Sequence, residues 1–425
     1  MLTLKQIRED KQRTLSGLAL KGFAAEAIIE EIISLDDQRK GLQLELEKNL
    51  SEQNRIAREI GVLFKQGNQA AANELKEKVA SLKESSKVLD TRFTEAETRM
   101  NEKIVLLPNL PYKLVPAGKT AEDNVVVKTG GLMPELPSEA LPHWELARKY
   151  DIIDFELGVK LTGAGFPVYK GQGARLQRAL INFFLDEARK AGYLEIMPPV
   201  VVNEDSGFGT GQLPDKEGQM YHVGIDNLYL VPTAEVPVTN IYRDVILNAS
   251  DFPVKMTAYT PCFRREAGSY GKDVRGLNRL HQFDKVEIVR LEHPDRSYEA
   301  LDEMIAHVEG LVQKLELPYR ILRLCGGDMS FTSAITYDFE VYSAAQKRWL
   351  EISSVSNFET FQANRLKLRY KEEGEKKTQL AHTLNGSALA LPRVVAALLE
   401  NNQRPEGIRI PDALVSYTGF PMISF

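Results

Sequence analysis

Apolar residues recur at alternating spacings of three and four along most of the first hundred positions, whereas the rest of the chain mixes short apolar runs with periodic segments. A spacing of three and four places apolar side chains along one stripe of an α-helix. The pattern therefore predicts a helical N-terminal quarter, followed by a region of strands and helices. The first stripe consists of Ile28, Ile32, Leu35, Leu42, Leu46, Ile56, Ile60 and Leu63.

A second apolar stripe follows a short polar break at residues 65–68. Gly67 and Asn68 in this break suit a tight reversal of the chain. Two stripes on either side of a turn predict an antiparallel helical hairpin with arms of about 35 residues, roughly 50 Å long at the rise of an α-helix. The second stripe consists of Leu75, Val79, Leu82, Leu89, Phe93, Ala96 and Met100.

Polar residues interrupt both stripes: Arg39, Asn49 and Gln53 in the first, and Ser86 in the second. An isolated hairpin of this kind usually serves as a spacer or a dimerisation element, and its mixed-charge outer face is typical of a solvated helix. An interrupted stripe is also compatible with a rod that projects alone into solvent. Both interpretations of the hairpin are open at this point.

Prolines at positions 108, 111 and 116, together with Gly118, end the helical pattern. Proline lacks a backbone donor and cannot continue a helix, so this segment reads as a linker. A chain of 425 residues is also long enough for two or three domains. The predicted parts are an N-terminal domain over 1–108, a linker over 109–118 and a second domain over 119–425.

The second region contains more predicted strands than predicted helices. Its segment GQGARL, residues 171–176, resembles a dinucleotide-binding loop only weakly, because no clear strand precedes it and a third glycine is missing. We therefore expect a mainly antiparallel sheet packed with helices, which is an α+β fold. The predicted strands are residues 194–202, 228–233, 283–291, 334–343 and 348–356, and the predicted helices are residues 176–190, 298–315 and 393–401.

Composition narrows the class of protein. The chain is 43% apolar and 27% charged with a net charge of -5, which argues mildly against nucleic-acid binding, although phosphate contacts need only a local basic stripe. The charged N-terminus and the lack of a run of ~20 apolar residues predict a cytoplasmic protein with no membrane partner. Cys262 and Cys325 lack metal-ligand spacing and the six histidines are scattered, so we expect no zinc.

Polar groups gather in four segments within otherwise apolar runs. Each segment alone has a plain structural explanation, such as a surface ion pair or an ordinary turn at Asn385-Gly386. Together they supply an arginine fork for phosphate, a carboxylate and a hydroxyl for a divalent ion, and polar groups for a small substrate. The segments are Thr-Ala-Glu at 233–235, Phe-Arg-Arg-Glu at 263–266, Glu-Ile-Ser-Ser at 351–354 and Thr-Leu-Asn-Gly-Ser at 383–387.

Alternation along a strand predicts which of these side chains share a face. Arg264 and Glu266 would lie on one face, and a glycine-punctuated basic stretch follows them as far as Arg279. Glu351 and Ser353 would share a face of their strand. Ser354 would then reach an ion held by Glu351 only through a local twist or a bulge.

Three stretches of the sequence resemble the motifs of class II aminoacyl-tRNA synthetases. GYLEIMPPVVV, residues 192–202, is similar to motif 1, in which the strand ends in a proline, here Pro199. FRRE at 263–266 is similar to motif 2, and GSALALPR at 386–393 is similar to motif 3. These matches imply the α+β catalytic domain of that class.

Longer strings resemble one family within this class, the bacterial type of seryl-tRNA synthetase. They are VPTAEVPVTN, PCFRREAGS, RGLNRLHQFDKVEIV, EISSVSN and HTLNGSALA. The helical hairpin is also characteristic of the family, and the resemblance extends from the first residues to near Phe425. Residues 161–176, LTGAGFPVYKGQGARL, depart from the common pattern, but none of the candidate residues lies there.

The resemblance implies an ATP-dependent serine–tRNA ligase. Such an enzyme activates L-serine to seryl-adenylate, releases pyrophosphate and transfers serine to the 3′ end of tRNA(Ser), and in this family also of tRNA(Sec). It implies a cytoplasmic homodimer with motif 1 at the interface, Mg²⁺ bound with ATP, no zinc, and a hairpin that reaches the long variable arm of the tRNA.

The resemblance also implies roles for the matched residues. Arg264 would hold the α-phosphate, with Arg265 beside it, and Glu266 would accept from the adenine amino group. Phe283 and Arg393 would sandwich the adenine. Arg264, Glu351 and Arg393 are thus the implied catalytic residues.

A metal site and a serine pocket complete the implied set. Glu351 and Ser354 would ligate Mg²⁺, and Ile352 and Ser353 between them would border the ATP. The implied serine pocket consists of Thr233, Ala234, Glu235, Glu287, Asn385 and Ser387.

Two other functions could use similar parts. A ligase that loads an amino acid onto a carrier protein would lack the hairpin. A non-catalytic tRNA-binding paralogue would have lost part of the set Arg264, Glu266, Glu351, Ser354 and Arg393. The complete hairpin and the complete set favour the tRNA ligase.

Overall fold

The chain folds into two compact units in the computed structural model. Unit 1 consists of residues 1–19 and 23–108, and unit 2 consists of residues 20–22 and 109–425. Among the described residues, no helix is both long enough and apolar enough to span a membrane. The structure describes residues 1–136, 139–215, 218–266 and 275–425.

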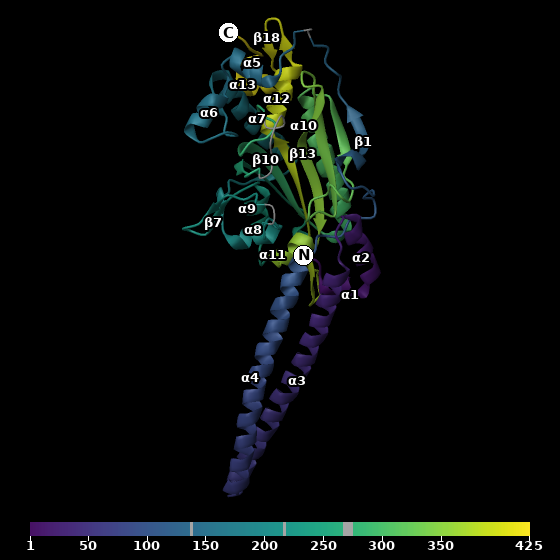
Figure 1. Ribbon diagram of the computed structural model, residues 1–425, viewed down its shortest axis with the longest axis vertical. Coiled ribbons are helices and arrows are strands. Elements are labelled where there is room, and N and C mark those ends of the chain that lie inside the picture. The colour runs from purple at the N-terminus through teal and green to yellow at the C-terminus, as the bar shows by residue number, and fades with distance from the viewer. Residues whose placement is uncertain (137–138, 216–217, 267–274) are drawn as a thin grey trace. The chain divides into compact units, whose positions relative to one another are not determined.

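Unit 1 is dominated by the predicted antiparallel hairpin, which the structure confirms (Figure 1). The chain reverses at Gly67, whose φ of +76° favours glycine, and the side chain of Asn68 caps the second arm by accepting from the backbone of Ala71. The helices are α1 (Leu4–Glu9), α2 (Lys11–Leu20), α3 (Glu26–Lys65) and α4 (Gln69–Val105).

The two arms bury each other's apolar stripes. Leu42 and Leu89 are buried between them, and the polar interruptions pair across the interface. Gln53 Nε2 donates to Ser86 Oγ at 2.8 Å. The stripe differs from the prediction near its start, where Ile29 is fully buried and Ile28 only partly. The hairpin is therefore an intramolecular coiled coil.

Unit 2 is built on an eight-stranded sheet in the order β1-β11-β12-β13-β16-β10-β9-β4. Its described pairings are antiparallel except for that of β4 with β9, which confirms the predicted α+β fold with a mainly antiparallel sheet. The strands are β1 (Val125–Gly130), β11 (Tyr319–Arg323), β12 (Ile335–Ser343), β13 (Arg348–Glu359), β16 (His382–Ala390), β10 (Gln282–Glu292), β9 (Val254–Phe263) and β4 (Leu194–Glu195).

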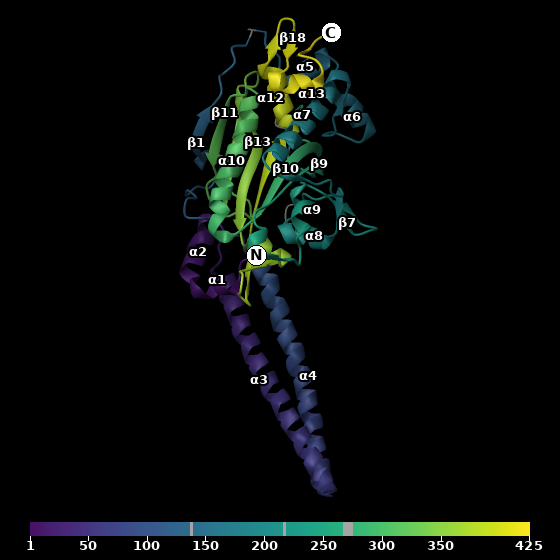
Figure 2. The same cartoon turned by 180° about the vertical axis from the view of Figure 1, so that it is seen from behind.

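Helices α7 (Gly171–Lys190), α10 (Ser297–Lys314) and α12 (Leu391–Asn401) cover one face of this sheet (Figure 2). Val286 of β10 and Phe339 of β12 point into the core beneath them and are fully buried. Because successive side chains of a strand point to opposite faces, the neighbouring Glu287 and Asp338 lie on the other face. The helical layer thus leaves the polar face of the sheet available for a site.

Smaller elements surround the two layers. The helices are α5 (His143–Lys149), α6 (Phe155–Leu161), α8 (Glu204–Thr210), α9 (Glu235–Asn240), α11 (Phe361–Leu366), α13 (Asp412–Thr418) and the 3₁₀ turns Ala121–Asp123, Ala249–Asp251 and Pro294–Arg296. The small sheets pair β15 (Thr378–Leu380), β14 (Arg369–Lys371) and β8 (Ile246–Asn248); β17 (Gln403–Arg404), β18 (Gly407–Arg409) and β19 (Met422–Ile423); β2 (Ile153–Asp154) and β3 (Val168–Tyr169); and β5 (Val201–Val202), β7 (Leu228–Leu230) and β6 (His222–Val223).

Several predicted boundaries differ from the structure; the strand predicted over 228–233, for example, ends at Leu230. Residues 194–202 do not form one strand: β4 pairs with β9, β5 joins a different sheet, and Pro198 and Pro199 between them cannot donate to a ladder. GQGARL opens helix α7, which starts five residues earlier than predicted. Gly173 is needed there because a Cβ would lie 2.2 Å from the carbonyl oxygen of Ile152.

Asn385-Gly386 lies inside central strand β16 and is not a turn. Gly386 pairs with Ile288 on one side and Val355 on the other. A Cβ at Gly386 would lie 3.1 Å from a methyl carbon of Val355, so the glycine allows close packing within the sheet. The polar segment at 383–387 therefore belongs to a buried strand that faces the site.

Candidate active site

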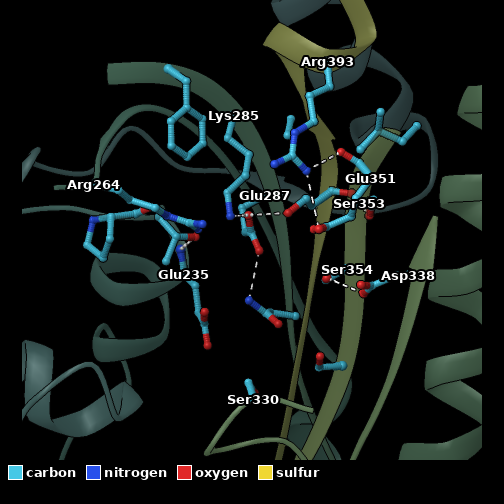
Figure 3. Close-up of a pocket in the computed structure, with 18 of the residues that line it drawn as sticks. Glu235, Arg264, Lys285, Glu287, Ser330, Asp338, Glu351, Ser353, Ser354 and Arg393 are labelled. Carbon is cyan, nitrogen blue, oxygen red and sulfur yellow. Dashed lines mark hydrogen bonds and ion pairs between the residues drawn. The ribbon is translucent and has the colours of Figure 1, made fainter. Parts of the chain in front are cut away.

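A pocket of about 670 Å³ opens on the polar face of the sheet (Figure 3). Strands β10, β12, β13 and β16 form its floor, and the segment after β9 and the first turn of α12 form parts of its sides. Most residues predicted for the site line this one pocket. They are Thr233, Glu235, Arg264, Glu266, Phe283, Glu287, Glu351, Ile352, Ser353, Ser354, Asn385, Ser387 and Arg393.

Two of the predicted residues do not line the pocket. Ala234 is fully buried in a small apolar cluster with Val238 and Met256. The guanidinium carbon of Arg265 lies 5.8 Å from the ring centroid of Tyr221. Their neighbours in sequence reach the pocket, so adjacency in a motif does not by itself place a side chain in the site.

Glu287 is the most connected carboxylate of the pocket. Its Oε1 accepts from Asn385 Nδ2 at 2.9 Å, and its Oε2 lies 2.8 Å from Lys285 Nζ and 3.4 Å from Ser387 Oγ. Strand register explains this grouping, because Glu287 of β10 is directly opposite Ser387 of β16. Glu287 is almost fully buried, and Lys285 balances its charge.

Glu235 is a second buried carboxylate in the same part of the pocket. Gln362 Nε2 donates to it at 2.6 Å, and Thr383 Oγ1 holds the other end of the Gln362 amide at 2.6 Å. Burial, and then the negative charge of Glu287, raise the pKa of Glu235 to about 7. Glu235 therefore changes charge near neutral pH.

Arg264 lies one residue beyond β9, on the same side of the pocket as Glu235 (Figure 3). Its Nε donates to the carbonyl of Pro232 at 3.3 Å, and its guanidinium carbon lies 5.2 Å from the centroid of the Phe283 ring. Glu266 adopts a positive φ of 48° and pairs with Arg279 at 3.1 Å. Residues 267–274 of the basic stretch that follows lie outside the described residues.

Arg393 projects from the first turn of α12 over the edge of the pocket. Its NH1 donates to the backbone carbonyl of Glu351 at 2.8 Å and lies 3.4 Å from the Glu351 carboxylate. Its Nε donates to the backbone carbonyl of Asn278 at 3.1 Å. The guanidinium is thus fixed by groups from two segments.

A bulge in β13 brings Glu351 and Ser354 to the same face. Glu351 is opposite Glu340 of β12, whereas Ser353 is opposite Phe339, so Ile352 is an extra residue in the strand. The hydroxyl of Ser354 donates to Asp338. Burial and the charge of Glu351 raise the pKa of Asp338 well above its usual value.

This group of oxygen donors suits a magnesium ion. Carboxylate and hydroxyl oxygens are the ligands that Mg²⁺ prefers, and it usually keeps water and substrate phosphates as further ligands. A cation would relieve the repulsion between the Asp338 and Glu351 carboxylates. Within the described ranges, no cluster of three or more His, Cys, Asp or Glu side chains could hold a metal by protein ligands alone.

Two pocket residues, Lys285 and Asp338, escaped the sequence analysis although both lie on predicted strands. Gln362, which does not line the pocket but donates to Glu235, escaped it as well. Alternation from Glu287 would have found Lys285, two residues earlier on the same face. Gln362 lies outside the motif strings and reaches Glu235 only through the tertiary fold.

Residues 161–167, which depart from the family's common sequence pattern, contact a residue that holds the backbone of Arg264. The carbonyl of Gly165 accepts from the backbone of His281 at 2.9 Å, and Phe166 stacks on the His281 ring at 5.5 Å between centroids. The carbonyl of His281 in turn accepts from the backbone of Arg264 at 2.9 Å. The segment therefore contributes to positioning although it holds none of the candidate residues.

Two protein-family models match the chain. The tRNA synthetase class II core domain (G, H, P, S and T) matches residues 221–402, and the seryl-tRNA synthetase N-terminal domain matches residues 1–111. Unit 2 is thus a class II aminoacyl-tRNA synthetase core. Serine–tRNA ligase of Salinibacter ruber is 51% identical over 424 residues, covering 100% of this chain and 99% of that protein. The chain belongs to the seryl-tRNA synthetase family.

Solved structures agree over the whole chain. Seryl-tRNA synthetase from Pyrococcus horikoshii, complexed with ATP, is 32% identical with a TM-score of 0.94, covering 100% of this chain and 99% of that one. Cytoplasmic serine–tRNA ligase from Naegleria fowleri, in complex with AMP, is 25% identical with a TM-score of 0.89 and the same coverage.

Proposed function

We propose that the chain activates L-serine with ATP to seryl-adenylate and pyrophosphate, and then transfers serine to the 3′ end of tRNA(Ser) and of tRNA(Sec). One observation carries the proposal: a single pocket combines two arginines, Arg264 and Arg393, with two buried glutamates, Glu235 and Glu287. Arginine suits an anionic triphosphate and a glutamate suits a cationic amino group, so the serine carboxylate would lie between the two substrates' charged groups.

The two buried glutamates would select serine. Glu235, once ionised, would pair with the substrate ammonium, with Thr233 beside it. Glu287, Asn385 and Ser387 already form a hydrogen-bonded group that could take the substrate hydroxyl. Ala234 would contribute by packing beneath this wall, since its side chain is buried.

The two arginines would hold ATP. Arg264 covers Phe283 in this structure, so the adenine would displace the guanidinium from the ring and direct it to the α-phosphate. Arg393 would close on the other face of the adenine, and Glu266 would accept from its amino group. Arg265 would act indirectly, through its backbone bond to the carbonyl of Gln219 at 2.8 Å.

Glu351 and Ser354 would hold Mg²⁺ together with ATP, and Asp338 would accept from the hydroxyl of Ser354. When bound, the ion would neutralise phosphate charge. Ser353 would support this strand by donating to the carbonyl of Ser387 at 2.5 Å, and Ile352 would anchor it in the core. The protein groups therefore position the triphosphate against the substrate carboxylate.

Activation needs no covalent bond to the protein. A carboxylate oxygen of serine forms a bond to the α-phosphorus while the bond to pyrophosphate breaks, and Arg264 stabilises the charge that develops. A ribose hydroxyl of the tRNA then attacks the acyl carbon and AMP leaves. Positioning and electrostatic stabilisation account for both steps.

We assign residues 1–108 to tRNA binding, 109–118 to a linker and 119–425 to catalysis. The hairpin would meet the long variable arm of the tRNA. A homodimer in the cytoplasm would pair through the motif 1 region, which is supported by the exposure of Leu194 (64%) and Met197 (92%). Light scattering of the purified chain tests the dimer directly.

Serine-dependent exchange of pyrophosphate into ATP tests the activation step, and charging of purified tRNA(Ser) and tRNA(Sec) tests the transfer. Exchange with charging supports the proposal. Exchange without charging of any tRNA would favour a ligase for another acceptor, and loss of both would favour a non-catalytic paralogue.

A further inference from the structure

His143 and Glu400 form a fully buried pair outside the lining of the pocket. Nδ1 of His143 lies 2.7 Å from Glu400 Oε1, and the backbone N–H of His143 donates to the same oxygen at 3.0 Å. On the other side of the ring, Nε2 accepts from the backbone N–H of Leu277 at 2.8 Å. A carboxylate only accepts and an amide N–H only donates, so the two partners fix one neutral tautomer, with hydrogen on Nδ1.

The segment that contains Leu277 lies directly against this histidine. Gly276 has a φ of +68°, and a Cβ there would lie 2.2 Å from Nε2 of His143. The guanidinium carbon of Arg275 lies 4.7 Å from the ring centroid of Trp144. Helix α5, through its first two residues, therefore holds residues 275–277 by a hydrogen bond, a close approach and a ring contact.

The next residue connects the pair to the proposed nucleotide site. The backbone carbonyl of Asn278 accepts from Arg393 Nε at 3.1 Å, and its side-chain amide donates to Gln346 Oε1 at 3.1 Å. Gln346 Nε2 donates to Glu400 Oε1 at 2.9 Å. Glu400 thus holds both ends of a short network, one through His143 and one through Gln346.

Helix α12 closes the network. Arg393 and Glu400 are seven residues apart, which is close to two helical turns, so they lie on the same side of the helix. One end of this side faces the pocket and the other faces the buried histidine. A displacement of residues 275–278 would remove the carbonyl that fixes Arg393.

We propose that His143 and Glu400 are positioning residues for nucleotide binding, which hold the segment 275–278 so that Asn278 fixes the guanidinium of Arg393. The inference rests on the proposed function, because that function gives Arg393 its role at the adenine. Neither residue touches the pocket, and both act through the backbone of the segment between them.

Two substitutions at one position separate the two bonds of the histidine. In His143→Asn the amide reaches about as far as Nδ1, so the bond to Glu400 can remain and the acceptor for Leu277 is lost. In His143→Gln the amide oxygen reaches about as far as Nε2 and can still accept from Leu277. Gln346→Leu removes the second connection at a less buried position, and so guards against a His143 variant that fails to fold.

The measurements are the KM for ATP, the KM for serine and kcat of pyrophosphate exchange, with ATP affinity by calorimetry and the Tm of each variant. Leaving the Leu277 amide without its partner should raise the KM and Kd for ATP about tenfold in His143→Asn, with the KM for serine changed less than about twofold. His143→Gln should recover most of the ATP affinity, and Gln346→Leu should weaken it about threefold.

A packing role predicts a different pattern. A lowered Tm with both KM values and the ATP affinity unchanged would overturn the proposal, as would equal losses for ATP and serine or equal ATP affinities in the Asn and Gln variants. Absence of exchange in the unmodified chain would count against the proposed function instead. The calorimetric comparison would still test the positioning role in that case.

Discussion

Lys285 and Glu287, two residues apart on β10, form an ion pair of 2.8 Å although their side chains are only 7% and 1% exposed. Desolvation of two charges is costly, and a pair this deep gains little net stability unless its other partners are satisfied. Asn385 and Ser387 supply those partners for Glu287. The pair holds one carboxylate in a fixed position at the wall of the pocket.

Removing one member of this pair should be more harmful than removing both charges. Lys285→Met leaves Glu287 buried without its cation, and should lower the free energy of unfolding by about 3 kcal/mol. Adding Glu287→Gln in the double variant should recover most of that loss but none of the exchange activity. Chemical denaturation and pyrophosphate exchange measure the two quantities, and equal stabilities in the single and double variants would contradict the coupling.

Arg264→Ala should abolish most adenylate formation while the fold remains. Loss of one donor to charge that develops on the α-phosphate typically costs about 3 kcal/mol, roughly a hundredfold in rate. Arg148→Ala is a matched control, since that side chain is 85% exposed and pairs only with the exposed Glu156 in the contacts described. Near-normal exchange in Arg264→Ala would remove Arg264 from the proposed mechanism.

Serine should bind more tightly as the pH rises from about 6 to about 8. Glu235 has a pKa of about 7, so its carboxylate becomes available to pair with the substrate ammonium over this range. The KM for serine in pyrophosphate exchange should fall accordingly, and Glu235→Gln should weaken binding and flatten the profile. A profile unchanged by that substitution would mean that another group titrates.

The same pKa predicts an opposite trend for stability without substrate. The folded-state pKa of Glu235 is raised above its ordinary value of 4.5, so the proton stabilises the fold. That contribution is complete below about pH 4.5 and is lost as the pH rises through about 7. The free energy of unfolding of the unmodified chain should therefore fall relative to that of Glu235→Gln over this interval, as measured by denaturant titration.

Shortening the hairpin should separate activation from transfer. The cross-arm bonds of Asn49 with Ser85 and of Gln53 with Ser86 show which residues of the two arms are opposite each other. Residues 49–86 can therefore be deleted and replaced by a short glycine-containing turn while Leu42 and Leu89 still pack against each other. Serine-dependent exchange should persist, and tRNA charging should fall at least a hundredfold. A shortened hairpin that charges tRNA normally would make the arm a spacer.

The hairpin could be predicted from the sequence because its pattern is local. A spacing of three and four determines a helical stripe, and Gly67 with Asn68 marks the reversal. The large sheet was predicted in kind but not in detail. Strand β16 carries glycine and asparagine, which favour turns locally, and its place in the sheet follows from packing against Ile288 and Val355.

The pocket residues divide in the same way. Arg264, Glu351 and Arg393 have roles implied by recognisable strings, whereas Lys285, which lies in such a string without an implied role, and Asp338 are placed at the pocket by strand register. Gln362 comes from a short helix and meets Glu235 more than a hundred residues away in the chain. Such long-range contacts leave no periodic signal in one sequence.

The bulge at Ile352 determines which side chains of β13 face the core and which face the pocket. Before it, Leu350 packs in the core and Glu351 faces the pocket; after it, Val355 packs in the core and Ser354 faces the pocket. If Ile352 were instead accommodated in a regular strand without the bulge, the preceding residues would turn over, with Glu351 inward and Leu350 outward. The bulge therefore absorbs one residue and prevents an exchange of a carboxylate and an alkyl chain between the interior and the site, and this links the shape of the core to the chemistry of the opposite face.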